Sequence, residues 1–388
     1  MTLYAGLMSG TSLDGVDAVL AEWPASAPGG RLRELGFVHV DMPAALRVEL
    51  LALNSGGGAN ELHRAALAAN ALARLYAQAL TQLLEAAGLQ RDAVRALGAH
   101  GQTVRHRPGE FDGTGYTLQL LNGALLAELT GINVVCDFRS RDVAAGGQGA
   151  PLVPAFHAEV FGGSAGQAGM PDAEPVAPAA VLNIGGIANL TLLPATGAVL
   201  GFDCGPGNVL MDLWCQRQRG RPFDEGGVWA ASGQVQPALL RTFLEEPFFA
   251  RQPPKSTGRD LFDARWLDLR LAAQTAQAAQ AREDVMATLA ELTAAAACAA
   301  LARHGAGTRR LYVCGGGARN GHLMRRLAAL SGIEVVSTQE AGIAPERVEA
   351  LAFAGLARAH CEGRAGNLPA VTGAAAPRVL GALYPAGA

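Results

Sequence analysis

Four glycine-rich segments of this 388-residue chain hold the side chains whose types and spacing could do chemistry. The first runs from Gly6 to Asp17 and contains Ser9-Gly10-Thr11-Ser12. A turn of this composition exposes several backbone N–H groups and three hydroxyls, which together form a nest for an anion. Asp14 and Asp17 could contact a sugar hydroxyl or a hydrated magnesium ion. A surface turn capped by aspartate side chains would have the same composition, and the segment alone leaves both interpretations open.

The second segment, Gly201–Asn208, places Asp203 at the end of an apolar stretch and just before two glycines. An acidic residue at the end of a strand in an open α/β sheet is a common position for a general base. The glycine backbone amides would lie beside it. The alternative is that Asp203 caps the helix that follows, and we favour the catalytic role.

The third segment, Cys314–Gly321, has three consecutive glycines between a predicted strand and a predicted helix. A ribose or a flat ring can lie against a backbone without side chains, and a helix N-terminus stabilises phosphate by ~0.3–1 kcal/mol. A plain strand-to-helix turn explains the segment equally well. The pattern G-x-x-x-x-G-K-[ST] is absent, which excludes a P-loop, and the Rossmann pattern G-x-G-x-x-G is not matched.

The fourth segment, residues 137–149, combines two arginines with a glycine loop. Arg139 and Arg141 would suit a carboxylate or phosphate held by paired hydrogen bonds. Structural ion pairs with Asp137 and Asp142 are the alternative.

Outside these segments, the other polar residues do not indicate a metal site. His100 is expected to donate or accept a hydrogen bond in a pocket. His100, His106 and His157 do not have metal-ligand spacing, and no zinc is expected. Lys255 is the only lysine, so a Schiff-base mechanism has almost no candidate residue; it lies near substrate or in solvent.

The elements that must position these segments alternate between short apolar strands and helices. Both halves begin with a strand-turn-strand pair that has small residues at the turn, which favours an α/β chain with mixed sheets in two related lobes. A glycine- and alanine-rich stretch, Gly162–Pro178, is expected to be a surface loop. Strands are predicted over 3–7, 16–22, 37–41, 94–100, 133–137, 180–184, 189–193, 199–203, 310–314, 333–337 and 379–383; helices over 60–87, 122–129, 150–161, 207–217, 264–304 (two, split near 282–284), 321–330 and 345–360.

Composition excludes several function classes. Half of the residues are hydrophobic and 17% are charged, with a net charge of −3, so the chain has a large core and lacks the basic surface of a nucleic-acid-binding protein. Six scattered cysteines predict reduced core thiols and a cytosolic protein. The N-terminus lacks the basic start of a signal peptide, and the apolar stretch Leu292–Leu301 is shorter than the ~20 residues of a membrane span.

Six motifs in order along the chain resemble the anhydro-N-acetylmuramic acid kinases. They are Met8-Ser9-Gly10-Thr11-Ser12-x-Asp14-Gly15-x-Asp17, Gly101-Gln102-Thr103, Asp137-Phe138-Arg139 to Pro151-Leu152, Asn183-Ile184-Gly185-Gly186-Ile187-Ala188-Asn189, Gly201-Phe202-Asp203-x-Gly205-Pro206-Gly207-Asn208 and Cys314-Gly315-Gly316-Gly317-Ala318-x-Asn320. The resemblance covers nearly the whole chain and leaves out Gly162–Pro178, which is interpreted as an insertion.

The resemblance implies a two-lobed, actin-like ATPase fold of the ribonuclease H-like type, with mixed sheets and a cleft between the lobes. Lobe I is expected to comprise residues 1–135 and about 365–388, with the first phosphate loop. Lobe II is expected over residues 136–364, with the second phosphate loop and the adenosine site. ATP and Mg²⁺ are the implied cofactors.

The resemblance also implies roles for individual residues. Asp203 is expected to be the general base, and Glu349 a second acidic residue that reaches the active site. The residues expected to bind ATP are Gly10, Thr11, Ser12, Leu13, Asp14, Gly15, Val16, Asp17, Gly205, Gly207, Asn208, Gly315, Gly316, Gly317 and Asn320. Those expected to bind the sugar are Ser12, Asp14, His100, Gln102, Thr103, Arg139, Asn183 and Gly186.

No side chain is expected to ligate a metal ion directly. Met8 stands where the first loop of the superfamily usually begins with an aspartate. Magnesium is therefore expected to contact Asp203 or Asp14 through water.

The implied reaction opens the 1,6-anhydro ring of the sugar with water and phosphorylates O6, giving N-acetylmuramic acid 6-phosphate and ADP in peptidoglycan recycling. Acetal cleavage normally takes an acid and a base. Here the γ-phosphoryl group of ATP captures the leaving O6, so a base alone is needed. A kinase of another anhydro sugar, such as levoglucosan, and a non-catalytic actin-like ATP-binding module are the alternatives. A homodimer in the cytoplasm, binding a small sugar and neither nucleic acid nor membrane, is expected.

Overall fold

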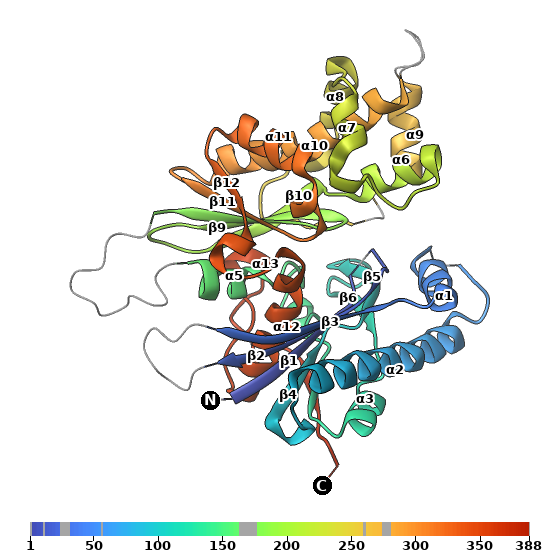
Figure 1. The fold of residues 1–388 in the computed structure, drawn as a ribbon, viewed down its shortest axis with the longest axis vertical. Coiled ribbons are helices and arrows are strands. Elements are labelled where there is room, and N and C mark those ends of the chain that lie inside the picture. Colours follow the sequence, from blue (N-terminus) through green and yellow to red (C-terminus); the bar gives the residue numbers. More distant parts are fainter. Residues whose placement is uncertain are drawn as a thin grey trace. The chain divides into compact units, whose positions relative to one another are not determined.

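The protein divides into two compact units. The computed structural model describes residues 2–10, 12–23, 32–55, 57–162, 177–258, 261–273 and 281–387. Unit 1 is Met1–Glu174 with Arg347–Ala388, and unit 2 is Pro175–Glu346 (Figure 1). The predicted boundaries, at 135/136 and about 364/365, differ from these divisions because the described residues 136–162 and 347–364 pack within unit 1.

Unit 1 is built on a six-stranded sheet with the order β13-β7-β4-β1-β2-β3, together with the separate hairpin β5-β6. Its strands are β1 Thr2–Met8, β2 Gly15–Trp23, β3 Arg33–Asp41, β4 Val94–Ala99, β5 Gln102–Pro108, β6 Gly115–Leu120, β7 Val134–Cys136 and β13 Ala382–Tyr384. Its helices are α1 Ala44–Ser55, α2 Glu61–Ala87, α3 Gly123–Thr130, α4 Ser140–Ala144, α5 Pro154–Phe161, α12 Val348–Cys361 and α13 Pro369–Thr372.

Two glycines explain why α12 belongs to unit 1. A Cβ atom on Gly6 of β1 would lie 1.8 Å from the carbonyl oxygen of Ala350, and one on Gly98 of β4 would lie 1.9 Å from that of Phe353. The helix backbone therefore lies directly on the sheet, which only glycine permits. The opposite face of the sheet packs on α2, whose Leu72 is fully buried in the same cluster as the β1 and β2 side chains.

Unit 2 is built on a five-stranded sheet with the order β10-β9-β8-β11-β12. Its strands are β8 Ala179–Ile184, β9 Ile187–Leu193, β10 Leu200–Pro206, β11 Arg310–Cys314 and β12 Glu334–Ser337. Its helices are α6 Val209–Arg219, α7 Val228–Ser232, α8 Pro237–Leu244, α9 Ala264–Ala272, α10 Arg282–His304 and α11 Gly321–Ser331. Side chains of these helices form one hydrophobic core with one face of the sheet.

The two sheets share one strand order. In each unit the first strand pairs with an antiparallel second strand, which pairs with an antiparallel third, and the first strand also pairs with a parallel fourth, which pairs with a parallel fifth. Unit 1 adds β13 antiparallel to its fifth strand, β7. The prediction of an α/β chain with mixed sheets is confirmed, and the repeated order agrees with two related lobes.

Several elements differ from the prediction. Helix α1, helix α8 and most of the hairpin β5-β6 were not assigned, and Gly101–Thr103 at the start of the hairpin was predicted as a loop. Arg105, His106 and Arg107 follow one another in β5, so this strand has no apolar alternation to indicate it. The first helix of the region 264–304 is short, and residues 274–280 lie outside the described residues, as do Thr11 and residues 163–176 of the predicted surface loop. All six cysteines are free and five are buried, as predicted.

Helix α10 is the longest apolar helix of unit 2. By length and composition it could cross a membrane, and it is longer than the stretch that the sequence indicated. Of its most apolar window, 72% is buried inside the protein. This is the burial of a core helix, and the hydrophobic residues of α10 pack on the sheet and on α11.

Candidate active site

A row of polar side chains crosses the sheet of unit 2 at the level of Asp203. In the strand register, Cys314 is opposite Asn183, Asn183 is opposite Asn189, and Asn189 is opposite Asp203. Residues opposite each other point to the same face of a sheet. The residues before and after Asn183, Asn189 and Asp203 belong to the helix-covered core. The polar row therefore lies on the other face of the sheet.

Asp203 is buried and bonded to backbone groups of the segment around Lys255. It is 7% exposed, and its Oδ2 accepts a hydrogen bond from the backbone N–H of Thr257 at 2.9 Å. Its own N–H donates to the carbonyl oxygen of Lys255 at 3.2 Å. The alternative role, capping the next helix, is not what the structure shows, because Asn208 occupies the N-cap position of α6. Asp203 is therefore a strand-end carboxylate on the polar face of the sheet.

Lys255 is buried, not solvated. Its Nζ donates to the carbonyl oxygens of Phe248 and Phe249, at 3.3 and 3.4 Å, and lies 4.7 Å from the centre of the Phe248 ring. Burial lowers the pKa of Lys255, while the thiol of Cys204 and the charge of Asp203 act in the other direction.

The glycine loops of unit 2 converge at the end of β8. The backbone N–H groups of Gly207 and Asn208 donate to the carbonyl oxygens of Gly186 and Gly185, at 2.9 and 2.8 Å. Asn208 Nδ2 also donates to the carbonyl oxygen of Ile184 at 3.2 Å. Gly205 has a φ of 143° at the irregular step that follows Asp203 in β10.

The loop Gly315–Gly317 lies against the same strand end. Gly315 has a φ of 75°, and a Cβ atom there would lie 2.5 Å from Asn183 Oδ1. A Cβ atom on Gly316 would lie 3.8 Å from Asn208 Nδ2. The structure thus brings Asn183, Gly186, Gly205, Gly207 and Asn208 together with the triple glycine.

Asn320 ends this loop and begins helix α11. Its Oδ1 accepts a hydrogen bond from the N–H of Leu323 at 2.9 Å, which makes it the helix N-cap. Only a glycine fits at position 227, because a Cβ atom there would lie 2.0 Å from Asn320 Oδ1.

In unit 1, the first loop is fastened to the start of the hairpin β5-β6. Ser9 is fully buried, and its hydroxyl contacts Tyr76 Oη at 2.9 Å and donates to the carbonyl oxygen of Gly101 at 3.1 Å. Gln102 Nε2 donates to the carbonyl oxygen of Gly10 at 3.2 Å. Ser12 and Asp14 lie at the tip, where the hydroxyl donates to Asp14 Oδ1 at 2.7 Å.

The remaining loop residues enter β2. Leu13 is buried, Gly15 and Val16 are the first residues of the strand, and Asp17 is the third. Asp17 Oδ1 lies 2.7 Å from Nδ1 of His39 in β3. Burial alone would lower the pKa of His39, but the hydrogen bond and charge of Asp17 raise it above its usual value.

Arg139 links the fourth segment to His100. Its guanidinium donates to the carbonyl oxygen of Gly149 at 2.8 Å and to His100 Nε2 at 3.0 Å. Burial and this positive charge lower the pKa of His100 to about 3, so the imidazole is neutral and accepts. Thr103 lies in the adjoining hairpin, where its hydroxyl accepts from Gln119 Nε2 at 3.2 Å. The predicted sugar residues His100, Gln102, Thr103 and Arg139 are therefore neighbours in unit 1.

The predicted ion pairs of the fourth segment are replaced by neutral contacts. Asp142 is fully buried and accepts hydrogen bonds from the N–H of Gly149, from Asn367 Nδ2 and from the hydroxyl of Thr372, at 2.6–2.8 Å. Asp137 accepts from the hydroxyl of Ser140 at 2.5 Å. Glu349 lies half-buried in the first turn of α12.

Among the described residues, no three His, Cys, Asp or Glu side chains form a metal cage. Magnesium in proteins commonly keeps several waters and takes one or two carboxylates together with phosphate oxygens. Asp14, which accepts a hydrogen bond from Ser12, and Asp203, which accepts one from Thr257, are carboxylates of the kind that could hold such an ion through water.

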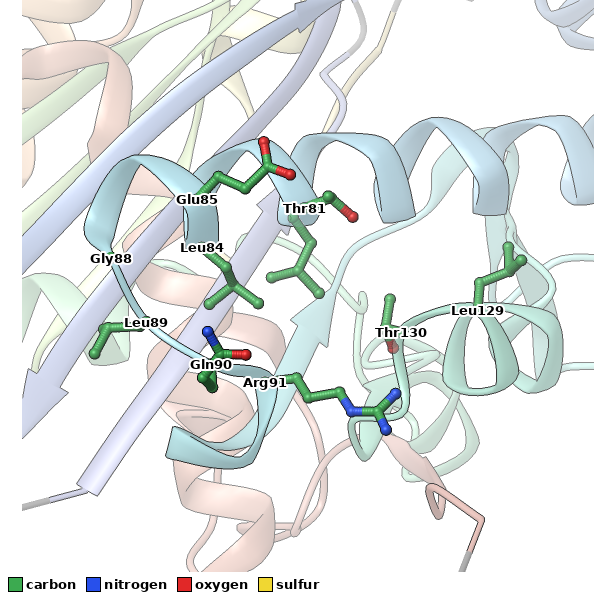
Figure 2. Close-up of a pocket in the computed structure, with 10 residues that line it drawn as sticks. Thr81, Leu84, Glu85, Gly88, Leu89, Gln90, Arg91, Leu129 and Thr130 are labelled. Carbon is green, nitrogen blue, oxygen red and sulfur yellow. The ribbon is translucent and has the colours of Figure 1, made fainter.

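A surface pocket of about 590 Å³ lies elsewhere in unit 1 (Figure 2). Its wall comes from the C-terminal part of α2, the residues after it and the end of α3. None of the predicted site residues lines it. The residues that do are Leu80, Thr81, Leu84, Glu85, Gly88, Leu89, Gln90, Arg91, Leu129 and Thr130.

The repeated strand order and the glycine loops at the ends of β1, β8 and β11 agree with the actin-like ATPase fold that the sequence resemblance implied. The model of the family described as anhydro-N-acetylmuramic acid kinase matches residues 2–386. The chain belongs to this family. It is 58% identical to the anhydro-N-acetylmuramic acid kinase of Variovorax paradoxus over 99% of both chains, and 55% identical to that of Cupriavidus pinatubonensis over 98% of both.

Solved structures with lower similarity include two further proteins. The activator of the 2-hydroxyisocaproyl-CoA dehydratase from Clostridium difficile, with bound ADPNP, is 14% identical with a TM-score of 0.46, over 93% of this chain and 98% of that one. The ROK hexokinase from Thermus thermophilus is 17% identical with a TM-score of 0.36, over 92% and 100%.

Proposed function

We propose that the protein is an ATP-dependent kinase that opens the 1,6-anhydro ring of 1,6-anhydro-N-acetylmuramic acid with water and phosphorylates O6. The products are N-acetylmuramic acid 6-phosphate and ADP, within peptidoglycan recycling. The observation that carries the proposal is the buried, backbone-held carboxylate of Asp203 at a strand end that is surrounded by glycine loops. Family membership over the whole chain supports the same conclusion.

The reaction needs one base. Asp203 takes a proton from water as the water oxygen bonds to C1 of the sugar, and the C1–O6 bond breaks. The electron pair of that bond stays on O6, which bonds to the γ-phosphorus of ATP, and ADP leaves. An aspartate, with an ordinary pKa near 3.9, is ionised at neutral pH, and a positioned base contributes ~10²–10⁴-fold to the rate.

Glycine loops and short polar side chains would bind the nucleotide. In unit 2 these are Gly205–Asn208, Gly315–Gly317 and Asn320, and in unit 1 the loop Gly10–Asp17. Backbone N–H groups at such loops stabilise phosphate charge, and positioning supplies most of the rate enhancement in phosphoryl transfer. Magnesium, when bound, neutralises the triphosphate, and Asp203 or Asp14 would hold it through water.

Sugar recognition would fall to polar residues of both units. Arg139 is positioned by His100 and Gly149, and a guanidinium suits the lactyl carboxylate of the muramic acid. Ser12, Asp14, Gln102, Thr103, Asn183 and Gly186 would bind hydroxyl and amide groups of the sugar, and Glu349 would be a second acidic group at the site. We further propose a cytoplasmic homodimer that binds neither nucleic acid nor membrane.

The test is ADP release coupled to a panel of sugars. We expect release with the anhydromuramic acid and background rates with levoglucosan or without sugar. Equal rates with levoglucosan would favour a kinase of simpler anhydro sugars. ATP binding without ADP release on any sugar would favour a non-catalytic ATP-binding module.

A further inference from the structure

Asn189 lies directly between Asn183 and Asp203 in the polar row, and neither the fold nor the proposed ligand contacts account for it. Side chains opposite each other on neighbouring antiparallel strands have Cβ atoms about 4.5–5.5 Å apart. The Asn189 amide is therefore an immediate neighbour of the Asp203 carboxylate, on the face of the sheet away from the helices.

The acceptor atom of the Asn189 side chain has no hydrogen-bond partner in the described part of the chain. Its Oδ1 is buried without a hydrogen bond. A buried acceptor left unpaired costs about 1–3 kcal/mol, so such an atom needs a ligand or a water to explain it. An apolar residue at this strand position would avoid that cost.

A second unpaired atom belongs to a residue whose backbone contacts the same carboxylate. The backbone N–H of Thr257 donates to Asp203 Oδ2, while the Thr257 hydroxyl is buried without a partner. A buried water is held by two to four polar groups. Asp203, Asn189 and Thr257 supply three groups of the kind that such a water needs.

We propose that Asn189 is a second catalytic residue, which holds the attacking water against Asp203. This inference rests on the proposed function. One proton of the water passes to the Asp203 carboxylate as the water oxygen bonds to C1 and the C1–O6 electron pair remains on O6, which accepts the phosphoryl group. The other proton stays on the new C1 hydroxyl and is hydrogen-bonded to Asn189 Oδ1. An amide is not a base at neutral pH, so Asn189 does not take a proton from the water. By accepting a hydrogen bond it determines which proton of the water is transferred to Asp203, and it orients the lone pair of the water oxygen toward C1.

The first test is Asn189→Leu, which keeps the volume and removes the acceptor. We expect kcat for sugar-dependent ADP release to fall at least about tenfold, with KM values for ATP and sugar changed less than about threefold. The melting temperature is expected to stay the same or rise, because an unpaired polar atom is removed from a buried position. Turnover within twofold of the unmodified protein would overturn the inference.

The second test is the pH profile of Asn189→Asp. A second carboxylate beside Asp203 disfavours ionisation of the base, so the acid limb of kcat should move to higher pH. A purely structural role for Asn189 would lower the rate without moving the limb. Thr191→Val is the matched control, because Thr191 is the next residue of β9 on the same face and is fully buried. Thr191→Val should leave the acid limb of the kcat profile at the same pH as in the unmodified protein.

Two outcomes separate this inference from the proposed function. If Asp203→Asn keeps near-normal activity, the proposed base is wrong. If Asp203→Asn is inactive while Asn189→Leu is normal, the base stands and the inference fails. A high-resolution crystal structure without ligands gives an independent readout. It should show an ordered water bonded to Asn189 Oδ1 and Asp203, and a direct hydrogen bond between the two side chains would contradict the proposal.

Discussion

Each unit carries an aspartate in the row of side chains that crosses its first three strands, on the second strand in unit 1 and on the third in unit 2. In unit 1 the row across the first three strands is Met8, Asp17 and His39. In unit 2 the corresponding row is Asn183, Asn189 and Asp203. Asp17 has a histidine partner at 2.7 Å, while Asp203 is held by a backbone N–H and stands beside an amide.

This difference shows how one framework separates two roles of a carboxylate. A carboxylate next to a cation is stabilised in its charged form and becomes a weaker base. Asp203 accepts a hydrogen bond from a backbone N–H, and in the proposed mechanism it accepts a proton from water. Each aspartate lies in the row across the first three strands of its sheet, and its neighbours in that row differ between the units.

The largest expected effect separates the two aspartates directly. Asp203→Asn should fold, bind ATP and lose sugar-dependent turnover by at least about 10²-fold, because the base is removed. Asp17→Asn should lower turnover at saturating ATP less than about tenfold, because its carboxylate is already engaged by His39. Steady-state kinetics with circular dichroism as the folding control measures both. Equal losses in the two variants would break the comparison.

As the pH is lowered, unit 1 should lose its folded structure before unit 2 does. Burial, aided by the charge of Arg139, lowers the pKa of His100 to about 3 and of His106 to about 4, and burial lowers that of His157 to about 3. Each histidine that is held neutral in the folded state lowers the free energy of unfolding as the pH falls below its unfolded-state pKa of 6.5. The loss is roughly 1.4 kcal/mol per pH unit for each such residue, down to its folded-state pKa.

Hydrogen exchange at pH 7.5 and 5.5, followed by mass spectrometry, measures this difference. Peptides of unit 1 should lose protection first, and His106→Gln should weaken the pH dependence. Earlier opening of unit 2 peptides would contradict the assignment of acid sensitivity to these three histidines.

Glycines of the predicted phosphate loop in unit 1 and of the predicted adenosine-side loop in unit 2 should tolerate alanine differently. Gly315→Ala should destabilise the protein by about 1–3 kcal/mol, because φ is positive and the new methyl group would collide with Asn183 and Ile184. Gly10→Ala should be near neutral for stability, because its Cβ would only approach Ser12 Oγ at 3.5 Å. Urea unfolding measures the free energy of unfolding of the two variants. Equal stability of Gly315→Ala and Gly10→Ala would contradict the expected difference.

The smallest expected effect concerns the His39–Asp17 pair. The raised pKa of His39 means that the pair stabilises the fold below pH 6.5 and that this contribution is lost as pH rises through the folded-state pKa. The pair is partly exposed, so a contribution of about 0.2–1 kcal/mol is expected. The difference in urea midpoint between the unmodified protein and His39→Gln should be larger at pH 5.5 than at pH 9, and the reverse order would be inconsistent with this account.

Sequence patterns predicted the strands of both sheets and the general position of Asp203, because apolar runs ending in glycine turns are strong local signals. They did not indicate Asn189. A two-residue turn at Gly185-Gly186 would place Ala188 opposite Asn183, whereas the structure pairs Asn183 with Asn189. A shift of one residue in the strand pairing moves every side chain to the other face of the sheet. The length of the turn fixes the pairing, and the sequence pattern alone did not show that length.

The domain boundaries depend on a similar non-local contact. Residues 345–360 were correctly predicted as helical, but nothing in their own pattern shows which sheet they cover. Gly6 and Gly98, which are distant from α12 in the sequence, determine the partner. Because they have no side chains, the backbone of α12 can lie directly on β1 and β4. Local pattern therefore predicts elements well, and it predicts their partners poorly.

The insertion of unit 2 between Glu174 and Arg347 determines the order in which the polypeptide matures during synthesis. Unit 2 is contiguous and can fold as soon as it leaves the ribosome. The N-terminal sheet waits for α12 and β13, which emerge on the order of tens of seconds after β4 at typical translation rates. During that interval the glycine-lined face of β1 and β4 lacks the helix that covers it in the folded protein.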